Sequence, residues 1–89
     1  MALFTAILEF DGGTYISQVR SASVRGAMSK YSSRLVADKA IPNAAAKRSL
    51  AVALRQDNPI SIADVHNVWC CSAVVGKKFA LLNIVQTAD

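Results

Sequence analysis

With 89 residues, the chain has room for one domain built around one hydrophobic core. Hydrophobic residues make up 53% of it, which excludes the intrinsically disordered class, where low hydrophobicity accompanies a high net charge. The net charge of +4 permits a nucleic-acid partner but is small for a dedicated nucleic-acid-binding domain.

Residues 3–20 predict a β-hairpin. The segments LFTAILEF and TYISQVR alternate along their length, and the DGG between them is a strong turn signal. Alternate side chains point to opposite faces of a strand, so the hairpin has a core face and a mostly polar face. The core face consists of Phe4, Ala6, Leu8, Phe10, Tyr15, Ser17 and Val19.

A helix is predicted next. Ser21 or Ser23 is suited to its N-cap, because a hydroxyl can accept a hydrogen bond from an unpaired backbone amide. We expect the helix to end near Ala40, since Pro42 disfavours helical geometry at the residue before it. Gly26 lowers the stability of this helix by up to about 1 kcal/mol relative to alanine. Its apolar stripe is Val24, Ala27, Met28, Tyr31 and Leu35.

A second helix is predicted from Asn43, its N-cap, to Gln56. Its apolar stripe is narrow and made of small residues, which is typical of a peripheral helix. Basic residues gather around this helix and form a candidate polyanion-binding surface. These residues are Lys39, Lys47, Arg48 and Arg55. A solvated basic surface is the alternative, because the aromatic residues are mostly on core faces and offer no stacking platform.

Residues 59–67 form a connector or a short extra strand, and residues 68–87 predict a second hairpin. Gly76 and Lys77 lie at its turn, because a glycine in the first central position suits a type II′ turn. One face of this hairpin carries Val68, Cys70, Ser72, Val74, Phe79, Leu81, Asn83 and Val85. The opposite face includes Trp69, Cys71, Ala73, Val75, Leu82 and Ile84. Both faces are therefore largely apolar.

A strand pair that is apolar on both faces must be covered on both faces, and a short chain has few elements to do so. We therefore expect a homodimer, because two-fold dimers are the commonest assembly. The candidate interface is Trp69, Cys71, Ala73, Val75, Leu82 and Ile84. In the alternative arrangement, the first helix covers one face of the hairpin while the second helix and the connector cover the other.

The predicted fold is one α+β domain over residues 1–89. Its elements follow the order strand, strand, helix, helix, strand, strand, and the two hairpins form a four-stranded antiparallel sheet with both helices on one face. The spatial order of the strands is not predicted.

No catalytic, metal-binding or cofactor-binding site is predicted within one chain. His66 is the only histidine, and no acidic residue is placed by sequence to orient it. Cys70 and Cys71 point to opposite faces of a strand, so they cannot form an ordinary disulfide or chelate one metal together. A site at a subunit junction, combining residues such as Glu9, Arg20 and His66, stays open.

Residues 4–35, FTAILEFDGGTYISQV followed by SASVRGAMSKYSSRL, resemble the opening of the HicB-like small antitoxin domains. Those domains begin with a strand, a glycine turn, a second strand and a helix. The resemblance implies a regulator that binds a protein toxin or nucleic acid. The chain also looks like many other short bacterial proteins.

The function expected from the sequence is therefore binding, in a homodimeric structural or interaction module that can also take a protein partner. An antitoxin-like regulator acting through the basic region around the second helix is the alternative, and a small enzyme with a site between subunits is a third. No apolar run reaches the roughly 20 residues of a membrane helix. Without an export signal either, we expect a cytoplasmic protein without a membrane partner.

Overall fold

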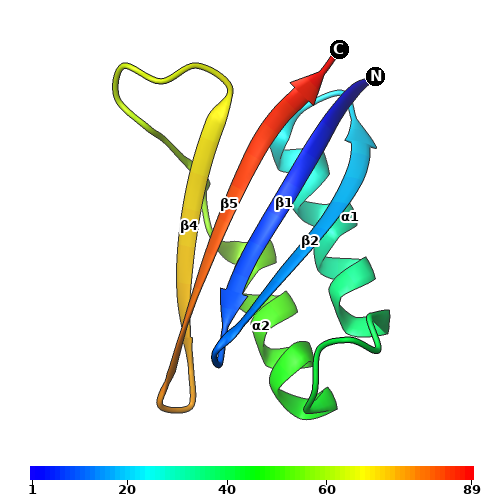
Figure 1. Ribbon diagram of the computed structural model, residues 1–89, viewed down its shortest axis with the longest axis vertical. Coiled ribbons are helices and arrows are strands. Elements are labelled where there is room, and N and C mark those ends of the chain that lie inside the picture. Colours follow the sequence, from blue (N-terminus) through cyan, green and yellow to red (C-terminus); the bar gives the residue numbers. More distant parts are fainter.

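The structure, a computed structural model, describes residues 1–89 and has two layers, an antiparallel sheet and two helices that pack on one of its faces (Figure 1). The elements are β1 (Ala2–Phe10), β2 (Gly13–Ser21), α1 (Val24–Ala37), α2 (Ala44–Gln56), β3 (Ile60–Ser61), β4 (Val68–Val75) and β5 (Lys78–Ala88). The strands lie in the order β2-β1-β5-β4-β3, and every neighbouring pair is antiparallel. The two chain termini therefore lie side by side, on β1 and β5 (Figure 1).

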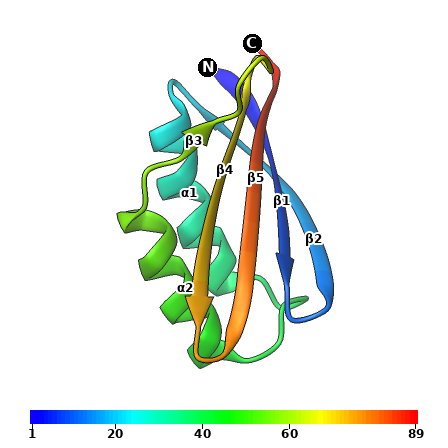
Figure 2. The same cartoon turned by 90° about the vertical axis from the view of Figure 1, so that its left-hand side faces the viewer.

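The sheet has five strands, whereas the sequence predicted four. The additional strand, β3, consists of Ile60 and Ser61, which pair with Cys70 and Trp69 at the edge of β4. Figure 2 shows β3 beside the upper half of β4, where the chain returns from α2. Two residues are too few to show a strand alternation, so sequence reasoning could not decide between a connector and a strand.

The two tight turns of the sheet depend on backbone conformations with positive φ. Phe10 pairs with Gly13, so the first turn is Asp11 and Gly12, with φ of 50° and 81°. Positive φ at both central residues is what a type I′ turn requires. In the second turn, Gly76 has a φ of 63° at the first central position, as the sequence predicted.

Both helices begin at the caps expected from the sequence. The Ser23 side chain accepts a hydrogen bond from the Gly26 N–H, and the Asn43 side chain accepts one from the Ala46 N–H, both at 3.1 Å. The first helix ends at Ala37, three residues earlier than predicted, where Asp38 takes an extended conformation. Neither helix combines the length and the apolar character that crossing a membrane requires.

The core lies between the helices and one face of the sheet. Both helices pack on this face, as predicted, and the first helix buries most of its expected stripe. The buried apolar side chains of the helices are Ala27, Met28, Tyr31, Leu35, Leu50, Ala51 and Leu54. Leu50 and Leu54 are at most 1% exposed, so α2 is a full part of the core, although its narrow stripe indicated a peripheral helix.

Candidate interaction surfaces

The residues predicted as a dimer interface lie on the side of the sheet that the helices cover. Three of them are buried in the core, namely Cys71, Leu82 and Ile84. The other three, Trp69, Ala73 and Val75, are partly buried and pack against that core. The Trp69 ring meets the Phe4 ring with 6.1 Å between centroids, within the range of favourable aromatic pairs.

The pairing of β1 with β5 explains this placement. Ala6 pairs with Ile84 and Leu8 pairs with Leu82, so the Leu82 side of the second hairpin continues the core face of the first. One subunit thus covers the predicted interface with its own helices. The uncovered side of the second hairpin is the opposite one, which carries Val74 and Phe79.

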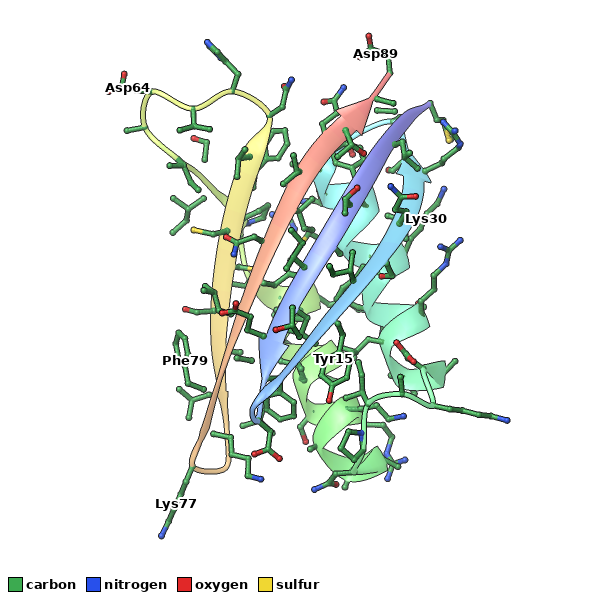
Figure 3. All side chains as sticks on the ribbon, viewed as in Figure 1. Tyr15, Lys30, Asp64, Lys77, Phe79 and Asp89 are labelled. Atoms are coloured by element: carbon green, nitrogen blue, oxygen red, sulfur yellow. The ribbon has the colours of Figure 1, made fainter.

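We call this uncovered side of the whole sheet the open sheet face. In Figure 1 the helices lie behind the sheet, so the open sheet face is toward the viewer. Its most exposed large apolar side chains are Ile16 (67%), Ile60 (67%), Val74 (69%) and Phe79 (60%). Figure 3 shows Phe79 beside the lower part of the second hairpin. Half-buried apolar side chains lie among them, namely Leu3, Ile7, Val68, Cys70, Leu81 and Val85.

The strand register places a row of side chains across the full width of the open sheet face. Ile16 pairs with Ile7, Ile7 with Asn83, Asn83 with Cys70, and Cys70 with Ile60. Four of these five side chains are apolar or weakly polar, and Asn83 is the only amide. The row thus carries apolar side chains toward both edges of the sheet, with Asn83 between them on the central strand β5.

A hydrogen-bonded group of polar side chains lies on this face at the end of the sheet where the chain termini lie. Gln18 donates to the Thr5 hydroxyl at 3.0 Å, and this hydroxyl lies 3.0 Å from that of Thr87. Within the strands, Glu9 and Arg20 are the charged residues of this face, and they lie toward opposite ends of the first hairpin. The third hypothesis combines these two with His66 at a subunit junction, and His66 belongs to the loop between β3 and β4.

The outer edge of β2 is protected by α1. Lys30 and Arg34, one helical turn apart, donate hydrogen bonds to the backbone carbonyls of Arg20 and Gln18. Cationic side chains at a sheet edge oppose pairing with another strand. A partner is therefore not expected at this edge.

The four predicted polyanion-binding residues separate in the structure. Lys47 turns inward, is only 8% exposed, and donates from Nζ to the backbone carbonyl of Asp38 at 2.6 Å. Lys39, Arg48 and Arg55 are exposed. Lys47 is therefore a structural residue, because its ammonium group is held inside the helical layer.

The structure adds Arg25 to this basic surface. Arg55 on α2 donates to the Ser33 hydroxyl of α1 at 2.9 Å, while Arg25 on α1 donates to the side chain of Asn58 just after α2. Both arginines thus cross the line where the two helices meet, which we call the helical seam. Sequence reasoning missed Arg25 because it lies 30 residues from Arg55, and only the packing of α1 on α2 brings them together.

Two hollows lie near the remaining titratable groups. A hollow of about 330 Å³ lies where the first hairpin turn meets β5, lined by Glu9, Asp11 and Phe79 among others. Asp11 is paired there with Lys78 at 2.7 Å. Another, open hollow of about 560 Å³ is lined by the loop between β3 and β4, which carries His66. No three His, Cys, Asp or Glu side chains come close enough together to hold a metal ion.

No protein-family model, curated protein or solved structure matches this chain. The resemblance of residues 4–35 to the HicB-like domains stays a prediction.

Proposed function

We propose that this protein acts by binding and that it self-associates, with the open sheet faces of two copies packed against each other. The observation that carries the proposal is the group of four large apolar side chains on this face that are 60 to 69% exposed. A contiguous apolar patch on a folded protein is typical of an interaction site, because its hydration is unfavourable. Antiparallel sheets commonly bury such faces in two-sheet sandwiches.

The size of the face suits a dimer. Strands lie about 4.8 Å apart and rise about 3.3 Å per residue, so four strands of about nine residues present roughly 600 Å². A standard stable interface takes about 800 Å² from each partner. Side chains add to the area of the flat sheet, so one open sheet face supplies nearly all of such an interface.

The two charged residues of the face favour a second copy as the partner. Glu9 lies near the hairpin turn of β1, and Arg20 lies near the far end of β2. A two-fold axis across the strands places the Glu9 end of one copy over the Arg20 end of the other. The face is then complementary to itself in charge as well as in its apolar character.

The test is the mass of the protein in solution. Val74→Lys places a charge on the open sheet face beside the β4–β5 turn, whereas Val52→Lys places one on α2, where the valine is 52% exposed. We expect a light-scattering mass of two chains for the wild type and for Val52→Lys, and of one chain for Val74→Lys. Circular dichroism checks that both variants keep the fold.

A wild-type mass of one chain at high micromolar concentration would contradict the proposal. Dissociation by Val52→Lys but not by Val74→Lys would move the interface to the helical layer, and equal dissociation by both would contradict an interface confined to the open sheet face. Neither result depends on a variant that disturbs the core, because both valines are largely exposed.

A further inference from the structure

The helical layer carries the positive charge of the protein. Residues 22–58 hold seven of the ten lysines and arginines but only two of the six acidic residues. The acidic residues, Asp38 and Asp57, lie at the C-terminal caps of the helices. The one salt bridge of the protein, Lys78 with Asp11, lies at the hairpin turns, so no cation of the helical layer is neutralised by an ion pair.

Three arginines follow the helical seam. Arg55 and Arg25 cross it through their hydrogen bonds to Ser33 and Asn58. Arg48 precedes Arg55 by seven residues, which is about two turns, so it lies on the same side of α2. Asn58, where Arg25 is held, follows Arg55 by three residues. At about 1.5 Å per residue, Arg48 and Arg55 are roughly 10 Å apart along α2, and the Arg25 guanidinium at Asn58 extends the row beyond the end of the helix.

We infer that the helical seam binds the sugar–phosphate backbone of a nucleic-acid duplex through Arg25, Arg48 and Arg55. Each strand of a duplex carries one phosphate per about 3.4 Å of axis, so the row of arginines spans at least about three phosphates. The planar guanidinium group donates two parallel hydrogen bonds to a phosphate, which a lysine cannot do.

The chemistry of the seam favours a duplex over other polyanions. Single-stranded nucleic acid is held by stacking on exposed aromatic rings, and Tyr31, the aromatic residue of α1, is only 3% exposed. An anionic membrane requires an apolar face to insert, but Val36 and Val52 are the only large apolar side chains that the helices expose. Contacts with phosphates alone do not distinguish one base from another, so binding should not depend on the nucleotide sequence of the duplex.

This site is independent of the proposed dimer interface. The helices cover the opposite side of the sheet from the open sheet face (Figure 2). A dimer through the open sheet faces leaves both helical seams on its outside. Failure of self-association and failure of duplex binding are therefore separate results.

The test compares two double variants that have the same net charge. Arg48→Gln with Arg55→Gln removes two charges from the seam, and Lys77→Gln with Lys78→Gln removes two from the β4–β5 turn. Lys77 extends away from the molecule at the opposite end from the chain termini (Figure 3). Binding to a labelled mixed-sequence DNA duplex is measured by fluorescence anisotropy across a series of salt concentrations.

We expect the seam variant to bind at least about 10-fold more weakly and to lower the salt slope by about 2, because each arginine neutralises about one phosphate. The turn variant should change affinity by less than about 3-fold. Light scattering should give both variants the wild-type mass, and circular dichroism should give both the wild-type spectrum.

Several results would overturn the inference. They are no duplex binding by the wild type at low salt, equal weakening by both variants, and tighter binding of a single strand of the same sequence. Seam-dependent binding to anionic vesicles, without binding to the duplex, would reassign the arginines to lipid.

Discussion

The hydroxyl of Ser21, at the end of β2, occupies the space beside Gly26 in the first turn of α1. A Cβ on Gly26 would lie 2.3 Å from the Ser21 Oγ, much closer than atoms in contact can approach. Ser21 is buried, and its Oγ also accepts a hydrogen bond from the Ser23 N–H at 3.3 Å. Packing against the Ser21 hydroxyl therefore favours the glycine that helix propensity disfavours.

Gly26→Ala is expected to lower the free energy of unfolding by about 1 kcal/mol, although alanine is the better helix former. In a protein that already carries Ser21→Ala, Gly26→Ala should raise the free energy of unfolding by up to about 1 kcal/mol, because the obstructing hydroxyl is gone. Urea denaturation of the wild type, the two single variants and the double variant measures the energetic coupling between Ser21 and Gly26. An equal effect of Gly26→Ala in both backgrounds would exclude this explanation.

Lys47→Met tests how much the buried ammonium group of Lys47 contributes to stability. Methionine keeps the apolar part of the side chain but leaves the Asp38 carbonyl without its donor at 2.6 Å. We expect a loss of about 2 kcal/mol in the free energy of unfolding, as for other hydrogen bonds to charged groups. Arg48→Met, at the exposed neighbouring position, is the control and should change stability by less than about 0.5 kcal/mol. Similar losses in both would show that Lys47 has no special role.

Stability should fall at alkaline pH because of Cys71. Burial, with smaller effects of Asp57 and Cys70, raises the pKa of this thiol from 9.0 to about 12. The unfolded chain therefore loses the proton above pH 9 while the folded chain retains it, so the free energy of unfolding decreases as pH rises. The decrease is at most about 1.4 kcal/mol per pH unit for one group.

Burial also raises the pKa of Tyr31, which adds to the same trend at higher pH. Urea denaturation between pH 8 and about pH 11 measures the slope, and Cys71→Ala should make it shallower. An unchanged slope in Cys71→Ala would assign the effect to other groups.

Cys70 provides a probe of self-association that needs no mutation. It lies half-buried in the row that crosses the open sheet face, whereas Cys71 is buried in the core. Alkylation by iodoacetamide should modify Cys70 before Cys71, because a thiol must reach solvent to react. If the open sheet faces pair, the rate at Cys70 should fall as protein concentration rises. A rate independent of concentration would argue against that interface.

Much of the fold could be predicted because it depends on local rules. The turn residues, both helix caps and the apolar stripe of α1 each involve residues within a few positions of one another. The alternation in the first hairpin identified its core face, since its other side is polar. The second hairpin has no polar side, so alternation separates its two faces but does not say which one meets the helices.

The amino-acid sequence by itself determined the α+β class, two hairpins, two helices and an excess of apolar surface on the second hairpin. Only the tertiary structure decided that Trp69 faces the helices while Phe79 stays exposed, because this depends on pairing Leu8 with Leu82 across 74 positions. The same holds for the inward turn of Lys47 and the meeting of Arg25 with Arg55. Contacts between distant segments arise from packing whole elements together, and no local pattern encodes them.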